Sequence, residues 1–259
     1  MMSRELIEKF ETQGFLKASY PIFTAEEFSR LSRCVLKAVD NKLRQKSGFL
    51  RQAWLVEPDL IEFACNDKLV EFLNSFLGSN IGVFASSIYK KEANSIFEAP
   101  WHSDVSNFDQ VTQGLRAVSV TIAISDCTEA SGCLEYSPGS HLKRVREHSY
   151  GFTPENSLFG EEQHYELIDA EVKSLAPAAL MELKSSEVSV ADLATVHRSG
   201  PNLSANDRVI LVFRYFSTSS DSPLTEPAKI FWRSNRHTFL VSGEDTQGIC
   251  RHSLVVKPK

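Results

Sequence analysis

Two short segments carry side chains that bind metal ions. In Trp101-His102-Ser103-Asp104, an imidazole and a carboxylate lie two residues apart. Residues i and i+2 of an extended chain point the same way, so both side chains could reach one ion. Such a pair also arises by chance, most often in a surface turn. Alone, this motif indicates a metal site only weakly.

The second segment runs from His197 to Arg208. Here a His ends one expected strand, a turn follows at 199–202, and an Arg begins the next strand. Two His and one carboxylate, with three coordination positions left open, are the ligand set of non-haem Fe(II) oxygenases. An Arg beside such a site offers a fork to a carboxylate, for which the far end of 2-oxoglutarate is suited. For this segment taken alone, an exposed His and an Arg that caps a strand is the slightly favoured interpretation.

The elements before these segments are expected to be helical. Thr24 and Glu27 have the spacing of a capping box. Behind them, apolar residues recur at three- and four-residue steps: Phe28, Leu31, Val35, Ala38 and Val39. A second helix is predicted over 67–77 with Gly78 as its stop, and a short one within 58–65. These helices are expected to lay apolar faces against a larger core.

From about Ile81 the pattern changes to strands and turns. Apolar and small polar residues alternate over 117–125, and 209–213 form a dense apolar strand. Shorter strands are expected near 133–136, 179–184, 187–196, 229–233 and 252–256. Many short strands after a helical start indicate one all-β barrel or jelly roll with helices outside. The weakly patterned segment 142–178 is of the length typical of a lid or binding loop.

Composition excludes several classes of protein. The 259 residues include 28 Lys and Arg against 33 Asp and Glu, a net charge of -5 that disfavours a nucleic-acid partner. Five Cys form no C-x-x-C pair, so a reducing compartment is expected rather than a disulfide framework. No signal peptide or apolar membrane span is visible. We therefore expect a cytoplasmic protein without a membrane partner.

Several motifs in one order resemble the phytanoyl-CoA dioxygenase family. They are W-H-x-D at 101–104, G-C-L-x-x-x-P-G-S-H at 132–141 and H-x-S-G-P-N-x-S at 197–204, followed by Arg208. The opening at 10–16 is also similar. The likeness extends from about residue 5 to about residue 216 and is vague in 142–178. It implies a mainly β fold with flanking helices around a double-stranded β-helix (jelly-roll, cupin-like) core, and dependence on Fe(II), 2-oxoglutarate and O2.

The resemblance also implies roles at matching positions. His102, Asp104 and His197 would hold the iron. Arg208 would bind the far carboxylate of 2-oxoglutarate, and Ser199 would support that carboxylate. These are roles carried over from the family, residue by residue.

Other assignments depend on register or rest on weaker matches. Thr121 would lie against the cosubstrate, and either Arg51 or Gln52 would be an upstream contact, with no motif to choose between them. His141 is expected to be structural. Because Asp104 is present, halogenation, which needs a small residue there, is disfavoured.

Residues facing the substrate are harder to assign. Arg208, Ile210, Val212 and Arg214 share one face of a regular strand. Arg214 could therefore bind an anionic substrate, but pairing with a carboxylate of the protein is the favoured interpretation. Phe108 could line the mouth of the site, and Phe231-Trp232-Arg233 could be core or substrate wall.

Together these observations predict one domain over 1–259, with a helical wrap at about 1–80 and a jelly-roll core at about 81–259. The expected activity is hydroxylation of an aliphatic carbon of a small molecule, with release of succinate and CO2. Desaturation, cyclisation and epimerisation are not distinguished by the sequence, nor is the substrate. A metal-dependent hydrolase and a non-catalytic protein that binds 2-oxoglutarate and iron remain as alternatives.

Overall fold

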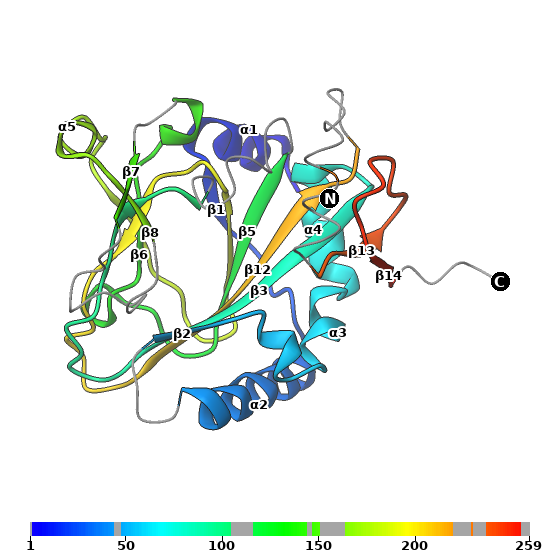
Figure 1. Ribbon diagram of the computed structural model, residues 1–259, viewed down its shortest axis with the longest axis horizontal. Coiled ribbons are helices and arrows are strands. Elements are labelled where there is room, and N and C mark those ends of the chain that lie inside the picture. The colour runs from blue at the N-terminus through cyan, green and yellow to red at the C-terminus, as the bar shows by residue number, and fades with distance from the viewer. Residues whose placement is uncertain are drawn as a thin grey trace.

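The computed structural model describes residues 2–43, 48–104, 116–143, 147–150, 164–219, 229 and 237–254. Within them lie a larger and a smaller β-sheet, a two-stranded hairpin, and helices packed against the larger sheet. Figure 1 shows helices α2, α3 and α4 together along the long strands β3 and β12, with β6, β7 and β8 on the opposite side.

The larger sheet contains eight of the described strands in the order β1-β10-β5-β12-β3-β13-β14, with β2 also paired to β3. Their bounds are β1 Phe15–Lys17, β2 Gly48–Arg51, β3 Ile81–Lys91, β5 Ala117–Ala123, β10 Val188–Asp192, β12 Arg208–Ser217, β13 Phe239–Ser242 and β14 His252–Ser253. The three central strands β5, β12 and β3 are antiparallel neighbours. These three strands form the centre of the larger sheet.

The smaller sheet has the order β4-β11-β6-β9. Its strands are β4 Ala99–His102, β6 Leu134–Tyr136, β9 Ala179–Met181 and β11 His197–Ser199. A separate hairpin, β7 Glu147–Tyr150 with β8 His164–Leu167, precedes the single helical turn α5 Asp169–Val172. Part of the expected 142–178 loop is thus regular structure.

The helices are α1 Arg4–Gln13, α2 Ala25–Lys42, α3 Leu60–Ala64 and α4 Asp67–Leu77, with 3₁₀ turns at Ala53–Leu55, Glu129–Ser131 and Ser140–Leu142. Thr24 and Glu27 form the predicted capping box at the start of α2. Gly78 ends α4 with φ 78°, a conformation that glycine adopts without strain. The three helices predicted from the sequence are confirmed.

Successive side chains of β5 point to opposite faces of the larger sheet. Val118, Val120 and Ile122 pack with the helices, whose buried residues include Leu31 and Val35. Burying each such side chain stabilises the fold by about 1.5–3 kcal/mol. The opposite face of the sheet, which carries Ser119 and Thr121, looks toward the smaller sheet and contributes to a cavity.

Two strands within the first eighty residues, β1 and β2, were not expected. At three and four residues each they are too short to show a period of two, and their partners β10 and β3 lie far along the chain. The predicted strand at 229–233 falls outside the described residues apart from residue 229. Among the described helices, none is long and apolar enough to cross a membrane.

Candidate active site

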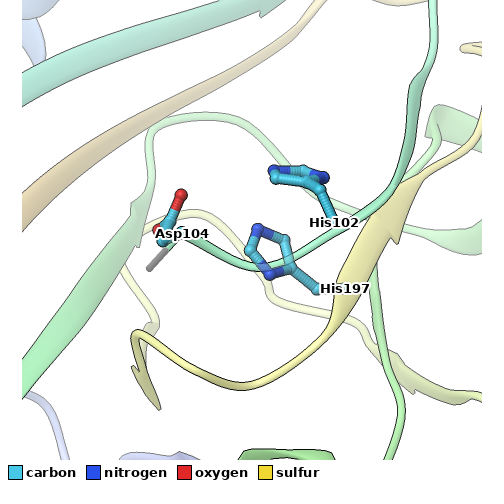
Figure 2. A group of neighbouring side chains, drawn as sticks. All are labelled: His102, Asp104 and His197. Carbon is cyan, nitrogen blue, oxygen red and sulfur yellow. The ribbon is translucent and has the colours of Figure 1, made fainter. Parts of the chain in front are cut away.

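The smaller sheet brings two histidines together. His102 ends β4, His197 begins β11, and the two residues are direct partners in the antiparallel pair. Their ring centroids are 4.3 Å apart. Asp104 follows β4 by two residues, and one potential ligand atom from each of the three side chains lies within 4.8 Å of the others. Figure 2 shows the Asp104 carboxylate facing the two imidazoles.

Both imidazoles are oriented by the backbone two residues before them. Nδ1 of His102 lies 2.7 Å from the carbonyl oxygen of Pro100, and Nδ1 of His197 lies 2.9 Å from that of Thr195. A carbonyl can only accept, so each Nδ1 donates, and the neutral imidazole then presents its lone pair at Nε2. A backbone carbonyl on the remote nitrogen is the usual support of a metal-binding His.

Asp104 is buried and paired. Arg214 donates to its Oδ1 from Nη2 (2.9 Å) and to its Oδ2 from Nε (3.0 Å), and Ser119 Oγ donates to Oδ2 (2.8 Å). Burial acts to raise the pKa of the carboxyl, but the Arg214 charge and hydrogen bonds, with the imidazoles, hold that pKa well below its usual range. Asp104 is therefore an anion, the state in which a carboxylate binds metal.

All three side chains line a cavity between the sheets. Arg208, Ser199 and Thr121, the residues predicted to contact the cosubstrate, line it as well. Alternate residues of β12 face it, as the strand pattern predicts: Arg208, Ile210, Val212 and Arg214. The structure thus brings the three predicted metal ligands and the three predicted cosubstrate contacts to one cavity.

Arg208 is almost fully buried at the inner part of this cavity wall. It donates from Nη1 to the carbonyl oxygen of Gly132 (3.0 Å), while its Nε has no hydrogen-bond partner in the described structure. An unsatisfied buried donor is costly, by about 1–3 kcal/mol. An anion bound here would supply the missing acceptor.

Lys91 is a second buried basic side chain; the sequence offers it, with Tyr89 and Lys90, as a residue that could face the substrate, whereas the structure places it beside Arg208 and Ser199. It is the cross-strand partner of Arg208, and its Nζ donates to Oγ (2.7 Å) and the carbonyl oxygen (3.0 Å) of Ser199 and to that of Gly200. Burial, and then the charge of Arg208, lower its pKa to about 6. No local motif marks Lys91. The only available signal was that a Lys ends a strand otherwise rich in buried residues.

Other sequence candidates lie elsewhere. Neither Arg51 nor Gln52 is among the residues that line the cavity; Arg51 lies over the Phe49 ring, and Gln52 donates to the carbonyl oxygen of Phe84. His141 contacts the carbonyl oxygen of Glu11 near the end of α1 and is not among the residues that line the cavity with His102 and His197. Phe108 and 231–233 lie outside the described residues.

A second cluster of possible ligands, Cys34, Glu57 and Asp59, lies near α2. Glu57 is buried and pairs there with Lys37 at 2.7 Å. Burial raises the pKa of the Cys34 thiol, so the thiolate that a metal needs is disfavoured. This cluster is explained by its ion pair.

Two imidazoles and one carboxylate lie together in a cavity between the sheets, and a buried Arg lines the same cavity. This arrangement defines the class of non-haem iron dioxygenases that use 2-oxoglutarate. The phytanoyl-CoA dioxygenase family model matches residues 15–210. The chain belongs to this family, and it is a non-haem iron, 2-oxoglutarate-dependent dioxygenase.

Individual relatives agree with this family. An ectoine dioxygenase from Stutzerimonas stutzeri (strain A1501) is 26% identical over 90% of this chain and 85% of its own length. The crystal structure of EctD from S. alaskensis with 2-oxoglutarate and 5-hydroxyectoine has a TM-score of 0.69 at 16% identity, covering 88% of this chain and 79% of that one. EvdO2 from Micromonospora carbonacea var. aurantiaca, complexed with 2-oxoglutarate, gives 0.67 at 19%, covering 88% and 96%. These confirm the predicted fold class.

Proposed function

We propose that this dioxygenase hydroxylates an aliphatic carbon of a small molecule, releasing succinate and CO2, with His102, Asp104 and His197 as the iron ligands. The observation that carries the proposal is the convergence of these three side chains, each already held for binding by its own hydrogen bonds. Little reorganisation is required when the metal enters.

The bound iron with 2-oxoglutarate and O2 supplies the oxidising chemistry, and the chain supplies orientation. The carbonyl oxygens of Pro100 and Thr195 keep both Nε2 lone pairs directed at one point. The walls of the cavity, including Ile210 and Val212, limit water around the reacting atoms.

Arg208 would bind the far carboxylate of 2-oxoglutarate, as its unsatisfied Nε supports. Lys91 is not among the residues that line the cavity, but it contacts Ser199, which does, and its charged form would be favoured when the dicarboxylate binds. Ser199 connects the two, since its Oγ accepts from Lys91 and donates to the carbonyl oxygen of Gly132 (2.8 Å), the same oxygen that Arg208 contacts. Thr121 would lie against the cosubstrate, on a strand beside Arg208. A dicarboxylate would thus meet the Arg208 guanidinium and the fixed Ser199 hydroxyl.

The substrate would enter where Tyr89 and Arg214 line the cavity, away from Arg208 along β12. The relative from Stutzerimonas stutzeri is named for ectoine, a small molecule, which supports a small-molecule substrate. All five cysteines are free thiols, which supports the proposal of a reducing, cytoplasmic setting.

Anaerobic addition of Fe(II) and then 2-oxoglutarate tests the site. We expect a weak visible charge-transfer band, and after admission of O2 we expect succinate formation that rises with the true substrate in a small-molecule screen. His102→Ala should abolish both signals. A wild-type protein without the band and without succinate formation would refute the proposal.

A further inference from the structure

The two oxygens of Asp104 have different numbers of partners. Oδ2 accepts from Arg214 Nε and Ser119 Oγ, whereas Oδ1 accepts from Arg214 Nη2 alone. An ionised carboxylate offers about four lone-pair positions, about two on each oxygen. The described hydrogen bonds therefore occupy both lone-pair positions of Oδ2 and leave one lone-pair position on Oδ1.

The arginine that creates this asymmetry is itself fixed. Arg214 is buried, pairs with Ser119 across the β12–β5 ladder, and donates a further hydrogen bond to the Tyr89 hydroxyl (3.3 Å). The β12–β3 register shifts immediately after Arg214. Such irregularities re-aim side chains next to functional sites. The guanidinium fork consequently holds the plane of the carboxylate on a rigid strand.

We infer that Arg214, assisted by Ser119, is a positioning residue that restricts Asp104 to binding the metal through Oδ1 alone. This inference rests on the iron site proposed above. Two imidazoles and one carboxylate oxygen leave three coordination positions open. 2-Oxoglutarate takes two of them and O2 needs the third, so a second oxygen from Asp104 would occupy a position that turnover requires.

Charge alone does not produce this restriction. A lysine at position 214 would keep the positive charge, but its ammonium lacks the planar fork that engages both oxygens at once. Arg214→Lys and Arg214→Met are therefore expected to act alike, whereas an electrostatic or substrate-binding role predicts that Arg214→Lys resembles wild type. Arg198→Met is the matched control, because Arg198 lines the same cavity but pairs with Glu135 (2.9 Å).

The test uses metal-loaded protein without turnover. Wild type and variants are loaded with Mn(II), and the coordinated water molecules are counted by water-proton relaxation in the absence of 2-oxoglutarate. Infrared difference spectra of the Zn(II) forms report the separation between the antisymmetric and symmetric stretching bands of the Asp104 carboxylate. This splitting is wide when one oxygen binds the metal and narrow when both do. We expect one fewer water and a narrowed splitting in Arg214→Met and Arg214→Lys, with the Arg198→Met protein unchanged.

Ser119→Ala removes one hydrogen-bond donor to Asp104 Oδ2. Because this variant loses only a hydroxyl group, it should fold and can be measured even if the Arg214 variants do not fold. It is expected to narrow the splitting by a smaller amount. Wild-type water counts and splittings in the folded variants would overturn the inference while the iron site stands. Failure of the wild-type protein to bind metal would instead overturn the proposed function.

Discussion

Lys91 and Arg208 are direct partners across the antiparallel β3–β12 ladder, both buried. Two like charges side by side in a low-dielectric interior repel each other. No ion pair to a carboxylate joins either residue within the part of the chain that the structure describes. The strand register thus disfavours the charged form of Lys91 beside Arg208, and a carboxylate bound nearby would favour that charged form.

Binding of 2-oxoglutarate should take up a proton at neutral pH. With a pKa of about 6, Lys91 is largely neutral at pH 7.5 before the cosubstrate binds, and a nearby carboxylate favours its charged form. Calorimetric titration of 2-oxoglutarate in buffers of different ionisation enthalpy measures the uptake. Lys91→Met should eliminate it, and an equal uptake in this variant would assign the proton to another group.

Lys91 should also make the ligand-free protein more stable as pH rises. Its pKa is about 6 in the folded protein and near 10.5 when unfolded, so between these values the unfolded chain binds more protons. The free energy of unfolding should therefore increase by up to about 1.4 kcal/mol per pH unit in this window. Denaturant unfolding of wild type and Lys91→Met at pH 7, 8 and 9 isolates the contribution, which should be absent in the variant; parallel pH profiles would contradict it.

Arg208→Ala should weaken 2-oxoglutarate binding far more than metal binding. Hydrogen bonds to charged groups contribute about 1.5–3 kcal/mol each, so loss of the guanidinium should raise the 2-oxoglutarate Kd by about 100-fold. Mn(II) affinity, measured without cosubstrate, should change by less than about threefold, because Arg208 contacts Gly132 and none of the triad. Unchanged 2-oxoglutarate affinity would remove Arg208 from the cosubstrate site.

Tyr215→Phe should reduce stability and leave the cavity intact. The Tyr215 hydroxyl donates to the carbonyl oxygen of Ala64 at the end of α3 (2.9 Å), on the face of β12 opposite the cavity. Loss of a buried hydrogen bond costs about 1–3 kcal/mol. Thermal or denaturant unfolding should show this loss, with the 2-oxoglutarate Kd within about twofold of wild type.

Much of the fold follows from local patterns. The Thr24–Glu27 box begins α2, and Gly78 ends α4, because caps and glycines act within a few residues. Alternation over β5 correctly separates the helix-facing residues from Ser119 and Thr121. The G-C-L motif was recognised only as a family pattern; in the structure Gly132 has φ 67°, and an added Cβ would meet the carbonyl oxygen of Gly200.

What the sequence did not reveal depends on register between distant strands. The Asp104–Arg214 pair joins the exit of β4 to the far part of β12, and the Lys91–Ser199 contact joins β3 to β11. Such contacts depend on how distant strands pair and how the two sheets pack together. The spacing of residues within one short segment does not determine this. The same reason explains why Arg51 and Gln52, rather than Lys91, were considered as upstream cosubstrate contacts.

The pairing of β1 with β10 has a consequence for biosynthesis. Phe15 emerges from the ribosome early, whereas its partner Ala191 is made only after most of the chain. β1 therefore has no partner until β10 has been synthesised, and unpaired strands recruit other chains. A nascent chain that has lost residues 1–17 would keep the edge of β10 exposed permanently, so intermolecular strand pairing is its expected route to aggregation.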